Sequence, residues 1–203
     1  MLSEWINPKY LDEKEIIRIR SDFLNSKPYK NFSLDNFFIR GRIMQVKNAV
    51  KKEKFELVGK DLFTLSHTAD LSSSKNAVLR EFYKLFSSKE FVAFVGKLTQ
   101  EKLSLRIDMQ SHSMKQGNYL LFHDDVVEGR KIAYVVYLSG LSSNDGGALR
   151  LYDHKKPSKP IRQICPEFNS FMCFKVSDKS VHDVGEIKSN KERLTIGGWF
   201  YGN

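Results

Sequence analysis

The sequence predicts an α+β fold, with helices in the first half of the chain and a roll of short strands in the second. Before about residue 100, apolar residues recur at steps of three and four, which is the period of an amphipathic helix. After about residue 100 they alternate with polar residues, which is the period of a strand with one buried face. We therefore expect one domain of residues 1–203, in which the helices pack on one face of the sheets.

Three helical segments are expected before residue 100. LDEKEIIRIRSDFL (11–24) has an acidic first turn followed by an apolar stripe, and NAVLREFYKLF (76–86) has a second apolar stripe. A third helix is expected to begin at Ser87, because Ser87 and Glu90 have the spacing of a capping box. Stripes of this kind nearly always belong to a core, so we assign them no chemistry.

Short strands are expected from about residue 101 onward. The first, LSLRIDM (103–109), alternates apolar and polar residues, so Leu105 is expected on the buried face. Gly, Pro, Asp, Asn or Ser bounds each segment, as is typical of a sandwich or barrel-like roll. The later segments are YLLF (119–122), KIAYVVYL (131–138), GALRLY (147–152), SFMCFKV (170–176) and RLTIGGWFY (193–201).

The composition is that of an ordinary globular protein, with 41% hydrophobic and 28% charged residues. No apolar run is long enough to span a membrane, and the first residues lack the order of a secretory signal. Cys165 and Cys173 are too few for a disulfide scaffold, and both are expected to be buried free thiols. These features favour an intracellular protein, cytoplasmic or nuclear.

The net charge of +9 indicates an anionic partner: nucleic acid, a ribosomal particle or an acidic protein. The lysines are scattered, and the densest run is KNAVKKEK (47–54). A solvated helix face explains that run as well as contacts with phosphates do. The sequence contains no nucleic-acid-binding motif, so these alternatives stay open.

The segment LLFHDDVVEGRK (120–131) places a histidine and two aspartates directly after an apolar run that is fit for burial. One interpretation is a turn, because aspartate side chains bind nearby backbone amides. The other is a metal site, since His123 and Asp125 flank one residue and point to the same side of an extended chain. Together with His182 they would form a two-histidine, one-carboxylate face, which is typical of non-haem Fe(II) oxygenases.

Arg193 begins the last predicted strand and is the only arginine after Arg162. A buried arginine needs an anion, and a carboxylate matches its planar fork. A dicarboxylate that chelates iron at one end could offer its far carboxylate to Arg193, as 2-oxoglutarate would.

The sequence resembles the Fe(II)/2-oxoglutarate oxygenases with a double-stranded β-helix (jelly-roll) core, and within them the catalytic domain of the ribosomal prolyl hydroxylases. The resemblance extends from about Pro28 to Gly202. Those enzymes hydroxylate a proline in the decoding-centre protein of the small ribosomal subunit. The segments that carry the resemblance are PYKNFSLDNFF, LFTLSHTADLSSS, LREFYKLFSSKEFVAFVGKLT, LLFHDDVVEGRKIAYVVYLSG, GGALRLY and RLTIGGWFYG.

The resemblance implies a role for each matching residue. His123, Asp125 and His182 would be the catalytic iron ligands, while Arg193 and Tyr137 would bind the far carboxylate of 2-oxoglutarate. It also implies the cofactors Fe(II), 2-oxoglutarate and O2, with ascorbate in support. The partner would be a prolyl-containing protein, with a ribosome or rRNA contact through the basic surface.

Two departures from the family pattern stand out. The family usually has a tyrosine nine residues before the first ligand, where this sequence has Met114; Tyr119 is close by but out of register. Many relatives also carry a second, catalytically degenerate β-helix domain beyond the region that these 203 residues match. We expect any docking by that domain to be absent here or supplied otherwise.

The remaining polar and aromatic residues of these segments are expected to have structural roles. His67, His112 and His154 are expected to be surface or hydrogen-bonded structural histidines. Trp199 is expected in the core, with a place in a substrate groove as the alternative, and Asp124 in a turn. Gly146 and Gly147 are expected to relieve backbone crowding, and VVEGRK (126–131) to form a flexible rim.

Two other functions compete with prolyl hydroxylation. The first is a catalytically idle module that binds ribosomes or RNA with the same fold. The second is an oxygenase that acts on a different protein or on nucleic acid, because a fold and its cosubstrate motif do not decide the substrate.

Overall fold

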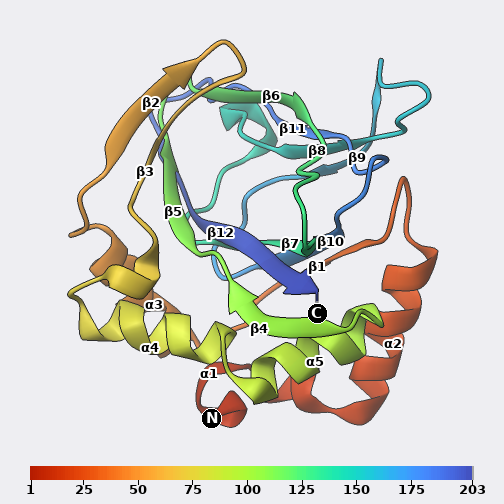
Figure 1. Cartoon of the computed structure of the whole chain (residues 1–203). Coiled ribbons are helices and arrows are strands. Elements are labelled where there is room, and N and C mark those ends of the chain that lie inside the picture. The colour runs from red at the N-terminus through yellow and green to blue at the C-terminus, as the bar shows by residue number, and fades with distance from the viewer. Residues whose placement is uncertain (203) are drawn as a thin grey trace.

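The computed structural model describes residues 1–202 and contains twelve strands, nine of them after residue 100 (Figure 1). The helices are α1 (Leu2–Trp5), α2 (Glu13–Asn25), α3 (Arg40–Val50), α4 (Ala77–Phe86) and α5 (Lys89–Thr99). The strands are β1 (Asn31–Leu34), β2 (Glu56–Lys60), β3 (Phe63–His67), β4 (Leu103–Ile107), β5 (Gln110–Met114), β6 (Tyr119–His123), β7 (Arg130–Tyr137), β8 (Leu149–Tyr152), β9 (Pro160–Ile164), β10 (Phe171–Lys175), β11 (His182–Val184) and β12 (Arg193–Gly202).

The strands form one antiparallel sheet that curls back on itself. Its order is β1-β10-β7-β12-β5-β3-β6-β11-β8-β9, with β2 added to β3 and β4 added to β12. In Figure 1 the β6, β11, β8 and β9 strands lie across from β12, β7, β10 and β1, while β5 and β3 connect the two layers at one side. This arrangement is the double-stranded β-helix, so the predicted α+β class and core are confirmed.

The helices cover the outer face of the layer that contains β7, β10 and β12 (Figure 1). Phenylalanines from both sides meet there; the Phe86 ring lies 4.5 Å from that of Phe91 and 4.8 Å from that of Tyr134. A second apolar cluster lies between the two layers and includes Tyr137, Leu151 and Met172. Burial of apolar surface on both faces makes the β7–β12 layer the rigid support of the interior.

The prediction that residues before about 100 are purely helical is wrong in part. The β1 strand pairs with β10 at one end of the sheet, and β2 and β3 form a hairpin against β5 and β6. The residues of β2 are mostly exposed, so no alternation of apolar side chains indicated this strand. Helix α3 was also missed, because its apolar residues form a weaker stripe than those of α4.

Several burial and boundary predictions are also corrected. Helix α5 begins one residue later than expected: Ser88 is its N-cap and accepts a hydrogen bond from the Phe91 amide at 3.2 Å. Ser87 instead ends α4. Cys165 is exposed, because the chain has left β9 at that point, whereas Cys173 is buried as predicted.

Three apolar side chains expected in the interior face solvent. Leu121 and Phe122 of β6 are exposed, and Leu105 is exposed because β4 pairs only with β12. Across the described chain, no helix is both long and apolar enough to cross a membrane. The organisation as a single domain stays a prediction.

Candidate metal centre and adjoining pocket

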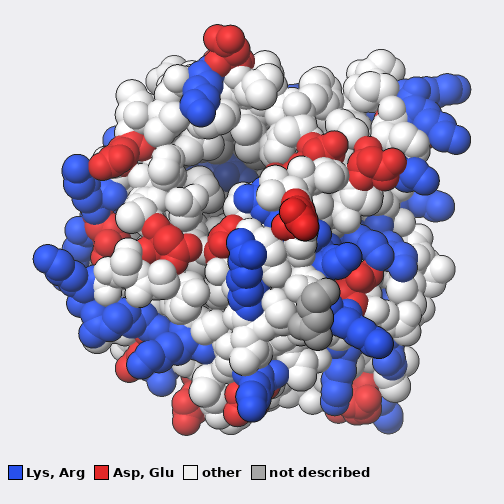
Figure 2. Space-filling model, in the orientation of Figure 1, with Lys and Arg blue, Asp and Glu red and all other residues white. Residues whose placement is uncertain are grey.

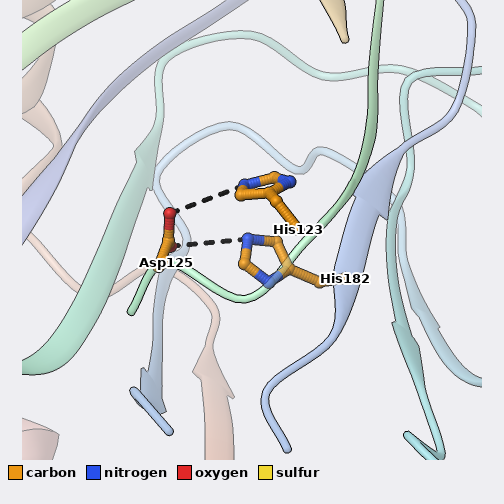
Figure 3. Close-up of side chains that lie close together, drawn as sticks. All are labelled: His123, Asp125 and His182. Carbon is orange, nitrogen blue, oxygen red and sulfur yellow. Dashed lines mark ion pairs between the residues drawn. The ribbon is translucent and has the colours of Figure 1, made fainter. Parts of the chain in front are cut away.

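Two histidines and one aspartate converge between the two layers of the sheet (Figure 3). His123 ends β6 and His182 begins β11, and these residues face each other in the antiparallel register. The Asp125 carboxylate faces both rings from one side: one oxygen is 3.5 Å from His123 Nε2 and the other is 3.4 Å from His182 Nε2. One potential ligand atom from each residue lies within 4.8 Å of the others, so the three can contact a single ion.

Backbone carbonyls orient the two imidazole rings. His123 Nδ1 lies 2.8 Å from the Leu121 carbonyl oxygen, and His182 Nδ1 lies 2.7 Å from the Ser180 carbonyl oxygen. Each Nδ1–H therefore donates to a carbonyl, which leaves the Nε2 lone pair directed at the site. Burial, followed by the neighbouring His123, lowers the pKa of His182 to about 4, so this ring is neutral at pH 7.

The backbone after β6 places Asp125 on the site side. Asp125 has a φ of +64°, in the left-handed region that aspartate tolerates better than most residues. Asp124 forms the turn that the sequence indicated, accepting a hydrogen bond from the Val126 amide at 3.0 Å. The Ser180 hydroxyl donates to the Asp124 carbonyl at 2.8 Å, which ties this turn to the segment before β11. The turn interpretation therefore holds for Asp124, while Asp125 lies where the metal-site interpretation needs a carboxylate.

The three side chains lie at one end of a cavity of about 340 Å³. Arg193 lies on the cavity wall in β12 and is buried, as its strand position predicts. Other walls come from β3, β5, β6, β7 and β8. Two imidazoles, a carboxylate and a guanidinium thus share one enclosed space.

Arg193 has no carboxylate partner within 4 Å among residues 1–202. Its Nε donates to the Gly147 carbonyl at 3.0 Å, its Nη1 lies 3.7 Å from Met114 Sδ, and its guanidinium lies 5.3 Å from the centre of the Tyr137 ring. Burial lowers the pKa of Arg193, yet a guanidinium stays charged in a protein. A buried cation without an anion is costly, so the cavity favours an anionic ligand here.

Tyr137 supplies a second unsatisfied group. Its hydroxyl is buried and has no hydrogen-bond partner within the described residues. Burial raises the pKa of this phenol, while Arg193 opposes the shift. A buried hydroxyl without a partner marks a position where a ligand or a water is expected. The donor set therefore fits a dicarboxylate whose far end lies between Arg193 and Tyr137.

The two glycines before β8 allow Arg193 its position. At Gly146, a Cβ atom would lie 2.0 Å from the Glu186 carbonyl oxygen, and at Gly147 it would lie 2.5 Å from Ile187 Cδ1. Both glycines also have positive φ angles, of +76° and +71°. The crowding expected from the sequence is present, and its consequence is that the Gly147 carbonyl reaches Arg193.

The remaining histidines and Trp199 lie in different environments. His154 is exposed, as expected, but His67 and His112 line the cavity. Trp199 also lines it, so the groove alternative describes Trp199 better than the core does. Sequence reasoning gave no role to His112, although its alternation with Met114 along β5 placed both on one face. Tyr119 does not line the cavity, in line with its position out of register.

Residues 109–201 match the family model described as the 2OG-Fe(II) oxygenase superfamily. The Prolyl 3-hydroxylase OGFOD1 of Mus musculus is 32% identical over 189 residues, which cover 88% of this chain and 34% of that protein. The Prolyl 3-hydroxylase sudestada1 of Drosophila melanogaster is 29% identical over 220 residues, which cover 100% of this chain and 40% of that protein. The chain thus spans little more than a third of the length of these relatives.

Solved structures share the fold. A Pseudomonas putida prolyl-4-hydroxylase superimposes with a TM-score of 0.75 at 13% identity, covering 93% of this chain and 99% of the other. A second likeness is to a Trichoplax adhaerens prolyl hydroxylase, which was solved with a peptide fragment of the hypoxia inducible factor oxygen degradation domain. It superimposes with a TM-score of 0.73 at 15% identity, and 95% of each chain is covered. At these identities, the likeness establishes the fold alone.

Proposed function

The chain contains a domain of the 2OG-Fe(II) oxygenase superfamily, and on that premise we propose that it is a 2-oxoglutarate-dependent dioxygenase that hydroxylates a prolyl residue of a protein. The observation that carries the proposal is the joint presence, in one cavity, of the His123–Asp125–His182 face and an unpaired buried Arg193. The relatives named prolyl 3-hydroxylases support the prolyl substrate.

In this proposal His123, Asp125 and His182 hold Fe(II), while Arg193 and Tyr137 hold the far carboxylate of 2-oxoglutarate. Bound Fe(II) supplies the oxidation chemistry, in which O2 gives one oxygen to the prolyl carbon and one to succinate, with release of carbon dioxide. The arrangement of two histidines and one carboxylate on one side leaves the opposite positions of an ion open for ligands.

The residues of this chain would bind the metal ion and orient the cosubstrate. The carbonyls of Leu121 and Ser180 fix the rings of the two histidines, so each Nε2 is ready to bind without rearrangement. The Arg193 fork fixes one end of the cosubstrate, and the apolar walls of the cavity exclude water from the other. Ascorbate is proposed only as a reductant that supports turnover.

We infer the substrate protein from the resemblance to the ribosomal prolyl hydroxylases: a decoding-centre protein of the small ribosomal subunit. A basic groove of about 620 Å³ supports a ribosome or rRNA contact. We name this surface the lysine groove. It is lined by Lys27, Lys30, Lys155, Lys175 and Lys179, with Asp153 as its one acidic residue.

The charge of the lysine groove is largely unneutralised. Lys175 pairs with Glu101 at 2.5 Å, but no carboxylate of the described chain lies within 4 Å of the other four lysine ammoniums. Figure 2 shows basic side chains gathered at the upper right, over the loop between β8 and β9. Several separate ammoniums match the spaced point charges of a phosphate backbone.

Mass spectrometry tests the proposed activity directly. A proline-containing peptide from the decoding-centre protein, incubated with the chain, Fe(II), 2-oxoglutarate and ascorbate, should gain about 16 mass units per oxygen inserted. Succinate should form in step with hydroxylation, and a peptide with alanine in place of the proline should give neither product. Tight ribosome binding without succinate or a mass shift would instead support an idle binding module, and oxidation of another substrate would overturn the prolyl assignment.

A further inference from the structure

His112 lies in a row of polar side chains that crosses the cavity wall. In the sheet, it stands directly opposite His67 of β3 and opposite Thr195 of β12, and Thr195 stands opposite Tyr137 of β7. Directly opposed residues of antiparallel strands point to the same face of a sheet. His67, His112 and Thr195 all line the cavity. The row therefore extends from the β3 side to the phenol that we place at the cosubstrate.

The His112 ring faces the cavity without a partner in the protein. Neither ring nitrogen has a hydrogen bond within the described residues, in contrast to His67, whose Nδ1 lies 2.9 Å from the Thr68 carbonyl oxygen. Gly197 of β12 lies beside the ring: a Cβ atom at that position would be 3.7 Å from His112 Nδ1, an ordinary van der Waals contact. Burial, and then Arg193, lower the pKa of His112 to about 4. A neutral imidazole keeps one N–H donor and one acceptor.

His112 lines the same cavity as Arg193 and the three proposed iron ligands. Arg193 stands opposite Met114, and His112 is two residues from Met114 along β5, which is about 7 Å at the rise of a strand. His112 interacts electrostatically with both Arg193 and Asp125. A dicarboxylate that reaches from Arg193 to the three proposed ligands would therefore pass His112.

We propose that His112 is a positioning residue that donates a hydrogen bond to the 2-oxo-acid end of 2-oxoglutarate. This inference rests on the proposed function, because it needs 2-oxoglutarate in this cavity. Met114 stands beside Arg193 where the family usually has a tyrosine, and a methionine side chain has no hydrogen-bond donor. This side of the cavity therefore has one donor fewer for the cosubstrate than the family pattern would supply. His112 supplies a donor from the same strand face, and its ring interacts electrostatically with Asp125 as well as with Arg193.

Equilibrium binding tests the proposal without turnover. The affinity for 2-oxoglutarate is measured by calorimetry under argon, on protein loaded with Mn(II). His112→Leu and His112→Ala should each raise the dissociation constant roughly tenfold, because a hydrogen bond to a charged group is lost. His112→Asn, which keeps an N–H donor, should recover a large part of the affinity. The exposed His154→Ala variant serves as the matched control, and the Mn(II) affinity should be unchanged in all four variants.

Two analogues identify the end of the cosubstrate that His112 contacts. 2-Oxopentanoate keeps the 2-oxo acid and lacks the far carboxylate, whereas glutarate keeps both carboxylates and lacks the 2-oxo group. The effect of His112→Ala should persist with 2-oxopentanoate, while that of Arg193→Lys should disappear. If both His112 variants bind 2-oxoglutarate as tightly as the parent, the inference is wrong. If the parent itself binds none, the proposed function fails instead.

Discussion

At the scale of single residues, Asp125 organises the proposed metal centre. Its two oxygens face two different imidazoles, at 3.5 Å and 3.4 Å. Both imidazoles present Nε2, because their Nδ1 atoms donate to backbone carbonyls. Three electron-pair donors held this close together repel one another, and a divalent ion bound to all three offsets that repulsion. The geometry therefore favours metal binding over a purely structural role.

The first prediction concerns these ligands. His123→Ala and Asp125→Ala should each abolish tight Fe(II) binding and 2-oxoglutarate turnover, because two ligands on one face do not hold the ion. His123 is only half-buried, so the fold should persist. Calorimetric titration with Fe(II) under argon checks the binding, and circular dichroism checks the fold. Normal metal affinity in both variants would remove the triad as the metal site.

The second prediction separates the cosubstrate from the metal. Arg193→Lys keeps the charge but loses the planar fork, so the binding free energy of 2-oxoglutarate should weaken by about 1–3 kcal/mol. Mn(II) affinity should change little, since Arg193 is not one of the three proposed ligands. Normal 2-oxoglutarate affinity in this variant would place the far carboxylate elsewhere in the cavity.

The third prediction is a pH dependence of stability. Burial lowers the pKa of His112 to about 4 in the folded chain, against an ordinary 6.5. Between pH 6.5 and 4 the unfolded chain therefore binds a proton that the folded chain does not, so stability is present above 6.5 and falls as the pH drops through this window. His112→Leu should remove up to about 2–3 kcal/mol of that decrease. Urea unfolding of metal-free protein at pH 7 and pH 5 measures it; equal pH dependence in both proteins would contradict the assignment.

Residue identity and spacing pointed to His123, Asp125, His182 and Arg193, and the structure brings all four to one cavity, although Asp125 reaches it from a left-handed turn rather than from an extended strand. They did not predict the cavity position of His112 or the exposure of Leu121. Both depend on how the sheet curls, which turns His112 of β5 toward the cavity and Leu121 of β6 toward solvent. Curvature is a property of the whole sheet and has no signature in one strand.

At the scale of elements, an ion pair holds β11 to β8 beside the metal centre. Arg150 of β8 donates through Nε and Nη2 to the two oxygens of Asp183, at 2.7 Å and 2.6 Å, and the Tyr152 hydroxyl donates at 3.1 Å. Asp183 is buried and follows His182 directly. The β11 strand spans only His182–Val184, so the Arg150–Asp183 ion pair restrains one of its three residues. That residue is next to His182, which the strand positions.

The fourth prediction tests this pair. Arg150→Met leaves the buried Asp183 carboxylate without its cation, and should lower the free energy of unfolding by about 3 kcal/mol. It should also weaken Mn(II) binding, because β11 is held less firmly. The double variant Arg150→Met/Asp183→Leu should recover part of the stability, since no charge is then buried. Urea unfolding and metal titration measure both; a single variant as stable as the parent would contradict the role of the pair.

The elements that the sequence predicted poorly share a physical cause. The β3 strand pairs with β5 and β6, whereas β2 pairs only with β3 and is mostly exposed, so β2 forms through hydrogen bonds rather than through a buried face. Helices α4 and α5 bury continuous stripes, and their existence was predicted correctly. Hydrophobic patterning thus predicts elements that bury a face and misses those at an edge.

At the scale of the whole molecule, the lysine groove and the metal cavity share a boundary. Tyr29 lines the groove, and its hydroxyl donates to the Val181 carbonyl, next to His182, at 3.2 Å. The Tyr29 ring also lies 5.8 Å from that of Phe174, which lines the cavity. A polyanion in the groove would therefore lie close to the centre that we propose for catalysis.

The fifth prediction assigns RNA contact to the lysine groove. A variant with Lys27→Gln, Lys30→Gln, Lys155→Gln and Lys179→Gln should bind small ribosomal subunits more weakly than the parent, because up to four phosphate contacts are lost. A plot of the logarithm of the binding constant against that of salt concentration should become shallower by about 3. Turnover of a short, uncharged substrate peptide should be unchanged. The matched control replaces four exposed lysines outside the groove, Lys51, Lys52, Lys60 and Lys84, and removes the same charge. If both variants lose ribosome affinity equally, net charge rather than the groove directs binding; if neither does, the basic surface has no part in it.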